Sequence, residues 1–260
     1  MKRNFLYLMI GLTIAASCSK DKAMPHMTMI TKAASKVLIG MRGNGTAIIN
    51  WGDSSPSEIC TLSSISTELV HNYSGSTSHI ITIAGEHITQ FGCASNQLIS
   101  LDVSNNAALT HLYCHDNQLT SLDVSKNTAL TNMDCRFNQL TSLDMSKNTA
   151  LTYMQCSVNQ LTSLDVSKNT ALTFLSCGAS PLTSLDVSKN TELTTLYYNN
   201  NKSQADALNA LFGTLPTIVS SVGYIYIGGN PGVTDAALDT SIATAKGWIV
   251  NTSFVWQAEN

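Results

Sequence analysis

A block of 21 residues recurs through the middle of the chain, and this repeat limits the possible folds more than any other feature. One position of the block is always aspartate and another is always cysteine. The positions are Asp102, Asp123, Asp144, Asp165 and Asp186, and Cys93, Cys114, Cys135, Cys156 and Cys177. A fixed period of this length predicts a solenoid in which every block forms one coil and stacks on the next.

Each block has two halves, and both place apolar residues at alternate positions. Leu112 and Cys114 alternate with polar residues in one half, as do Leu122 and Val124 in the other. This period predicts a short strand in each half, with these side chains in a core shared between coils. Two asparagine columns should bond turn backbone. They are Asn117, Asn138 and Asn159, and Asn106, Asn127, Asn148, Asn169 and Asn190.

The pattern Leu-x-x-Leu-x-(Leu/Val/Cys)-x-x-Asn in each half resembles leucine-rich repeats over residues 88–201. The 21-residue period resembles the IRREKO-type repeats, and the cysteine column resembles the cysteine-ladder internalins. The resemblance implies a mainly β repeat solenoid, a right-handed coil with short strands on two faces. It also implies that a ligand binds on a strand face.

The cysteine column is open to two interpretations, disulfides or buried thiols. Equal spacing and an odd number offer no obvious pairing, so we expect reduced cysteines that act as small apolar residues. His111 and His115 stand at odd offsets from Cys114 and should point away from it. They are also about 13 Å apart along a strand. We therefore expect no metal site and no cofactor.

The N-terminus has the features of a secretion signal. Two basic residues precede an apolar run, Phe5–Ala16, which is too short to span a bilayer. Small residues then lead to Cys18, which resembles the lipobox of bacterial lipoproteins. The resemblance implies that residues 1–17 are removed, that Cys18 is lipidated, and that the membrane is a partner through this anchor. An ordinary cleaved signal peptide is the alternative. Residues 18–35 are predicted to be a polar tether.

Two non-repetitive segments flank the repeats. Residues 36–87 are predicted to form strands at 36–41, 47–51 and 80–83. Their Trp51-Gly52-Asp53 and His71-Asn72-Tyr73 motifs resemble a PKD-like β-sandwich, with Trp51 and Tyr73 in the core and Asp53 fixing a turn.

Residues 202–260 are predicted to form an α/β cap that covers the last coil. Its elements are helices at 204–215 and 235–246 and strands at 224–227 and 248–250.

Composition narrows the function classes. Charged residues make up 12% of the chain and the net charge is −3. Without a basic patch we expect no nucleic-acid partner. The chain has no nucleophile elbow, phosphate loop or zinc-protease motif, so we expect that it is not an enzyme.

The repeats indicate where a ligand could bind. One half of each block is nearly constant, whereas the other varies at its outward positions, either because it binds a ligand or because exposed positions drift. The candidate residues are His111, Tyr113, His115, Asn132, Asp134, Arg136, Tyr153, Gln155, Phe174 and Tyr197. Exposed aromatic and charged groups together favour recognition.

The expected function is that of a lipoprotein at the outer membrane or cell surface of a Gram-negative bacterium. It would bind a host or bacterial surface protein, or a glycan, in adhesion. A structural or assembly protein of the envelope is the alternative. The repeated aspartate could be neutralised by the lysine three residues on, or could form a calcium ladder.

Overall fold

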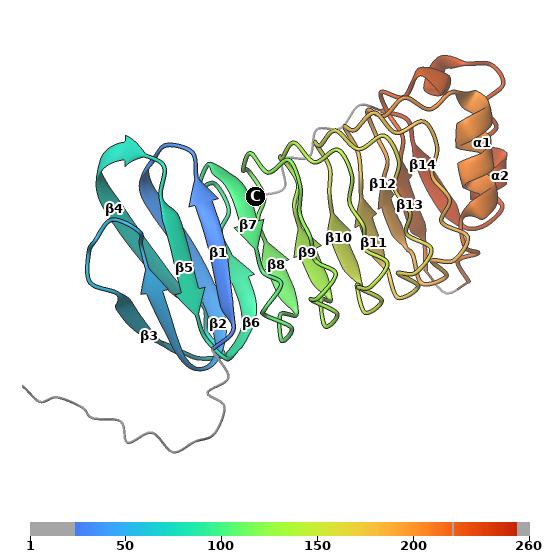
Figure 1. Ribbon diagram of the computed structural model, residues 1–260. Coiled ribbons are helices and arrows are strands. Elements are labelled where there is room, and N and C mark those ends of the chain that lie inside the picture. The colour runs from blue at the N-terminus through green and yellow to red at the C-terminus, as the bar shows by residue number, and fades with distance from the viewer. Residues whose placement is uncertain (1–23, 220, 254–260) are drawn as a thin grey trace, which may run out of the picture.

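The computed structural model describes residues 24–219 and 221–253, and fourteen strands in these residues form one continuous sheet system (Figure 1). The path of paired strands is β14-β13-β12-β11-β10-β9-β8-β6-β2-β5-β1-β7, with β3 and β4 also paired to β2. Figure 1 shows a broad two-layered part at the N-terminal end and a row of narrow coils leading to two helices.

The N-terminal part contains six strands. They are β1 (His26–Thr31), β2 (Ala34–Asn50), β3 (Glu58–Leu62), β4 (Thr67–Thr77), β5 (Ile80–Ala84) and β6 (His87–Gly92). Strand β2 belongs to both layers, because its first part pairs with β4 and β6 and its last part with β3 and β5. Ile39 and Met41 from the first part and Ile49 from the last part are fully buried between the layers.

Three sequence predictions for this part need correction. The strands expected at 36–41 and 47–51 are one strand, and β3 and β4 were not expected. Residues 26–31 of the tether predicted at 18–35 form strand β1 instead, which pairs antiparallel with both β5 and β7. Its alternate residues Met27, Met29 and Thr31 are fully buried, which explains why a segment that reads as polar is ordered.

The predicted roles of the two motifs in this part are confirmed. Trp51 and Tyr73 are buried, and the Tyr73 hydroxyl donates a 2.8 Å hydrogen bond to the Trp51 carbonyl oxygen. Asp53 accepts a hydrogen bond from the backbone N–H of Ser55, which fixes the turn. Asp53 also contacts His71 Nε2 at 2.7 Å, so its carboxylate joins the turn to β4.

The repeats form narrow coils with parallel three-residue strands, namely β8 (His111–Tyr113), β9 (Asn132–Asp134), β10 (Tyr153–Gln155), β11 (Phe174–Ser176) and β12 (Thr195–Tyr197). Strand β7 (Leu98–Asp102), from the constant half of the first block, has five residues and pairs antiparallel with β1. Strands β8 to β12 pair side by side with a 21-residue register, and β6 pairs parallel with β8. The N-terminal layers therefore continue directly into the coils.

The expectation of strands on two faces is wrong for most coils. Apart from β7, the constant half of each block forms turns. In one coil the Asp123 carboxylate accepts a bond from the Ser125 N–H, and Leu130 N–H donates to the Asn127 carbonyl oxygen. The Asn127 amide donates to the Val103 carbonyl of the previous coil. In this half of the repeat, asparagine side chains therefore form the hydrogen bonds between coils, whereas in a strand the backbone N–H groups would form them.

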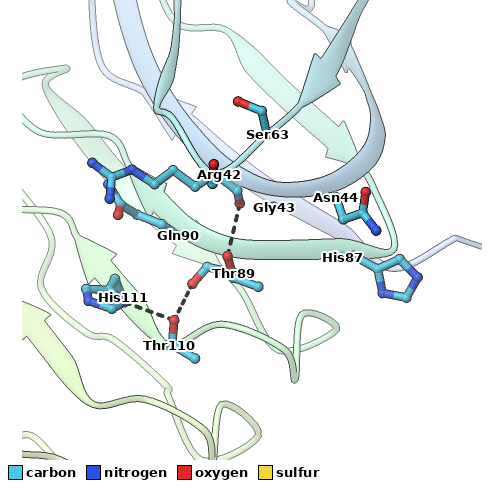
Figure 2. Close-up of a pocket in the computed structure, with 10 residues that line it drawn as sticks. Arg42, Gly43, Asn44, Ser63, His87, Thr89, Gln90, Thr110 and His111 are labelled. Atoms are coloured by element: carbon cyan, nitrogen blue, oxygen red, sulfur yellow. Dashed lines mark hydrogen bonds between the residues drawn. The ribbon is translucent and has the colours of Figure 1, made fainter.

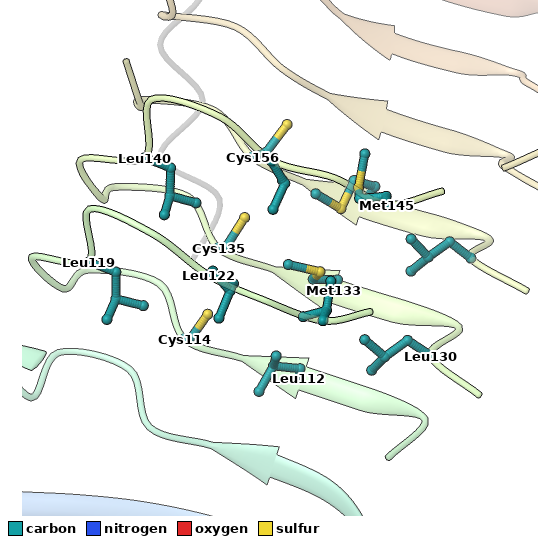
Figure 3. Close-up of a cluster of buried hydrophobic side chains, with 14 of the residues drawn as sticks. Leu112, Cys114, Leu119, Leu122, Leu130, Met133, Cys135, Leu140, Met145 and Cys156 are labelled. Atoms are coloured by element: carbon teal, nitrogen blue, oxygen red, sulfur yellow. The ribbon is translucent and has the colours of Figure 1, made fainter. Parts of the chain in front are cut away.

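Apolar side chains from both halves fill the interior of the coils, as predicted (Figure 3). Leu112 and Cys114 are fully buried, and Figure 3 shows Cys114, Cys135 and Cys156 one above another along the stack. The cysteines of the described residues are free, which confirms the thiol interpretation. Burial raises the pKa of the Cys156 thiol to about 12, so this thiol stays protonated at neutral pH.

The C-terminal end continues the sheet beyond the last coil, because β13 pairs parallel with β12, and β14 with β13. It contains α1 (Ala205–Thr214), β13 (Gly223–Tyr226), a 3₁₀ turn (Pro231–Thr234), α2 (Ser241–Thr244) and β14 (Trp248–Asn251). The first helix buries Leu208, Leu211 and Phe212, as predicted.

The helix expected at 235–246 is reduced to one turn. Asp235 and Asp239 accept hydrogen bonds from backbone N–H groups two residues on, and these local bonds compete with helix formation. Within residues 24–219 and 221–253, no helix is long and apolar enough to cross a membrane.

Candidate recognition face

Strand pairing arranges the outward side chains of the coils in two straight rows. The first row runs Arg42, Gln90, His111, Asn132, Tyr153, Phe174, Thr195 and Tyr224. The second row runs Tyr113, Asp134, Gln155, Ser176, Tyr197 and Tyr226. The residues between the rows, such as Leu112 and Met133, point into the core. We call the surface formed by these two rows the strand face.

Four rings, Tyr153, Phe174, Tyr197 and Tyr226, form an aromatic ladder along the strand face. Tyr153 and Phe174 stack with centroids 4.4 Å apart and planes 12° from parallel. Tyr197 and Tyr226 stack at 4.3 Å and 1°, and Phe174 lies 5.6 Å from Tyr197. Because stacked rings cover each other's faces, the ladder presents mainly ring edges to an incoming partner.

A charged group lies beside the ladder, nearer the N-terminal end. Arg136 Nε lies 3.2 Å from a carboxylate oxygen of Asp134, and His115 Nδ1 lies 2.7 Å from Asp116. Burial raises the pKa of Asp134, although nearby His115 and Arg136 act in the opposite direction. The face therefore combines a desolvated ion pair with apolar rings, a pairing common at the centres of interfaces.

Two of the predicted candidate residues are less accessible than their outward position suggests. Asp134 and Gln155 retain only 6% and 7% of their exposure. The ion pair with Arg136 holds Asp134 against the sheet, and the Gln155 amide donates a hydrogen bond to the Tyr153 hydroxyl. These two side chains are better placed to orient their neighbours than to meet a ligand directly.

The remaining candidate residues of the coils lie together on the strand face or at its edge. His111 and Tyr113 are half-buried, with ring centroids 6.2 Å apart. Asn132 accepts a hydrogen bond from the Thr131 hydroxyl. The lipidation candidate, Cys18, lies outside the described residues.

Sequence reasoning missed four members of the rows, Arg42, Gln90, Tyr224 and Tyr226. Arg42, Tyr224 and Tyr226 lie outside the 21-residue repeat, so its period could not align them with the coils, whereas Gln90 stands 21 residues before His111 and the period was the signal for it. The alternation Tyr224-Ile225-Tyr226 was the available signal, since it places both tyrosines outward once β13 is added to the sheet.

The repeated aspartates have a local structural role. Each accepts a backbone hydrogen bond from the serine two residues on, for example Asp144 from Ser146 at 2.8 Å. This bond lowers the pKa of the Asp144 carboxyl, with a smaller contribution from Lys147. No group of three or more potential metal-ligating side chains occurs in the part of the chain that the structure describes.

The repeat region resembles leucine-rich-repeat proteins in structure. No family model matches the chain, and no curated protein sequence matches it. Its neighbours among solved structures are leucine-rich-repeat proteins.

One neighbour is the functional domain of InlJ from Listeria monocytogenes, which includes a cysteine ladder. It is 35% identical, with a TM-score of 0.52 over 60% of this chain and 33% of that chain. This chain therefore spans about a third of InlJ's structure.

Two further neighbours are more distant. An internalin, InlF, from the same species is 20% identical, with a TM-score of 0.49 over 59% of this chain and 44% of that one. A leucine-rich-repeat protein of Leptospira interrogans is 20% identical, with a TM-score of 0.46 over 54% and 36%.

Proposed function

We propose that this protein is a bacterial surface lipoprotein that recognises a protein partner through the strand face. The single observation that carries this proposal is the aromatic ladder. Three of its four rings, Tyr153, Phe174 and Tyr197, lie in the half of the repeat that varies between blocks, while the other half stays nearly constant. Resemblance to internalins supports an adhesion role, because leucine-rich-repeat neighbours suggest interaction modules.

The ring geometry favours protein over glycan on this face. Sugars stack on open ring faces, whereas Tyr153 and Phe174 each cover one face of the other, and so do Tyr197 and Tyr226. Ring edges beside a charged pair suit apolar and polar side chains of a protein surface.

The membrane anchor would be Cys18, lipidated after removal of residues 1–17. The N-terminal strands, with their PKD-like motifs, would then hold the coils away from the outer membrane. Incorporation of labelled palmitate, lost in Cys18→Ala, together with proteolysis of intact cells, tests this part of the proposal.

The binding proposal is tested on arrays of purified extracellular proteins and of glycans. The test variant is Tyr153→Ser with Phe174→Ser, and the matched control is Thr141→Ala with Lys147→Ala on the constant half. We expect binding to one or more proteins that falls at least about tenfold in the test variant and is unchanged in the control. Binding only to glycans, or equal loss in both variants, contradicts the proposal.

A further inference from the structure

A groove of about 430 Å³, lined by polar and charged residues and two histidines, lies where the N-terminal strands meet the first coil (Figure 2). Strand β2, the segment before β4, strand β6 and the start of β8 contribute to it. Six of its lining side chains are hydroxyls or amides, namely Asn44, Ser63, Ser64, Thr89, Gln90 and Thr110. Arg42, His87 and His111 also line it, and none of the described lining residues is acidic.

Arg42 gives the groove a fixed positive charge. Its side chain is exposed, and within residues 24–219 and 221–253 its guanidinium has no hydrogen-bond or ion-pair partner. Strand pairing places Arg42 opposite Gln90, and Figure 2 shows the arginine extended along the groove above Gln90, on the side of His111. An arginine without a carboxylate partner has its planar donors available to a ligand anion.

His111 presents one defined nitrogen for a ligand. The Thr110 hydroxyl donates to the Thr89 carbonyl oxygen at 2.9 Å, so it can only accept from His111 Nδ1, also at 2.9 Å. The Nδ1 atom is thereby occupied and Nε2 is left for the groove. At the outer end, His87 contacts Glu86 at 3.8 Å and is already near a carboxylate.

We infer that this groove binds an acidic sugar unit, a pyranose bearing a carboxylate. The carboxylate would meet Arg42. One sugar hydroxyl would donate to His111 Nε2, and the others would meet the amides and hydroxyls of Asn44, Gln90 and Thr89. The volume lies within the range of about 300–1,000 Å³ typical of small-ligand sites. The lining contains no Leu, Ile, Val, Met, Phe, Tyr or Trp side chain, and its carbon surface comes from polar residues. This mixture suits the ring carbons and hydroxyls of a sugar better than a large apolar side chain.

This site is separate from the aromatic ladder, and its test does not depend on protein recognition there. The probes are D-glucuronic acid and N-acetylneuraminic acid, compared with acetate, glucose and N-acetylglutamate amide. Binding is followed by titration calorimetry and by the NMR signals of the His111 ring. We expect at least one sugar acid to bind about tenfold or more tightly than every comparison compound.

The variants locate the bound sugar acid. Arg42→Gln should weaken its binding about tenfold or more, and Asn44→Ala should weaken it less. Lys126→Gln, which removes a cation elsewhere on the coils, should leave it unchanged. Circular dichroism melting checks that each variant is folded.

Three results overturn the inference. Equal binding of acetate would show an anion site without sugar recognition, and equal binding of N-acetylglutamate amide would show a peptide site. Absence of binding by both sugar acids, or full binding by the folded Arg42→Gln and Asn44→Ala variants, would remove the site altogether.

Discussion

The side-chain amide of Asn138 donates a 3.0 Å hydrogen bond to the carbonyl oxygen of Cys114 in the preceding coil. It also donates to Cys135 in its own coil at 3.1 Å, and its oxygen accepts from the Leu119 N–H at 3.0 Å. One side chain therefore joins two coils. Ser180 occupies the same position two blocks later, and its hydroxyl is buried without a hydrogen-bond partner.

Restoring the missing amide should stabilise the stack. We expect Ser180→Asn to raise the free energy of unfolding by about 1 kcal/mol, because it pairs buried groups that now lack a partner. Urea denaturation followed by circular dichroism measures the change. The reciprocal control, Asn159→Ser, should lower stability by about 1–3 kcal/mol. A loss of stability in Ser180→Asn would show that this coil has adapted around the smaller side chain.

In each coil, the residue just before the position discussed above lies in the left-handed backbone region. These residues are Ser95, Asp116, Phe137, Val158, Ala179 and Asn200, with φ between 50° and 57°. The conformation is least favourable for β-branched Val158, whereas asparagine tolerates it. We expect Val158→Asn to increase stability by about 1 kcal/mol and Val158→Ala to gain less. Thermal melting measures both variants. Equal gains in stability would mean that the smaller side chain, and not the backbone preference of asparagine, causes the effect.

Strand β1 makes the N-terminal boundary of the folded unit earlier than the sequence suggested. A chain beginning at residue 33 loses the pairing to β5 and β7 and the burial of Met27 and Met29. Burial of each methionine contributes about 1.5–3 kcal/mol, so this truncation should lower stability by several kcal/mol. A chain beginning at residue 24 is the control. If both melt at the same temperature, β1 does not contribute to the fold.

The aspartate column should make stability depend on pH in the acid range. Hydrogen bonds from serine N–H groups lower the folded pKa of Asp123 and Asp144 below the ordinary 3.8. Their contribution is therefore present above about pH 4 and is lost as the pH falls through the folded values. Asp123→Asn with Asp144→Asn keeps the acceptor oxygen and should flatten this loss. Denaturant midpoints at pH 7 and pH 3 measure it, and an unchanged slope would contradict the argument.

The sequence predicted the coils well because the repeat constrains the backbone directly. Leu112 and Cys114 face inward since a 21-residue register puts equivalent residues side by side. The sequence predicted the opposite half of the repeat poorly. Leu122 and Val124 alternate with polar residues as strand residues do, so a strand was expected there. Whether they form a strand depends on turn bonds such as that of Asp123, which periodicity does not reveal.

The candidate site was predicted in position but not in accessibility. Alternation places Asp134 and Gln155 outward, yet both are covered, because their exposure depends on the long side chains beside them. Arg42 and Tyr226 were missed for the opposite reason. Arg42 joins the strand face because β2 pairs with β6, and Tyr226 joins it because β13 pairs with β12. The 21-residue period of the sequence does not show which non-repetitive segments pair with the coils.

The threonine that opens each coil has a consequence for how such a protein can change in size. Thr131 N–H bonds to Thr110 at 2.8 Å, and Thr152 and Thr173 bond to their predecessors at 2.9 Å. If one block is removed between two such threonines, the new junction can form the same threonine-to-threonine hydrogen bond as the original one. Duplication or deletion of a 21-residue block would thus lengthen or shorten the surface by about 4.8 Å while both ends stay intact.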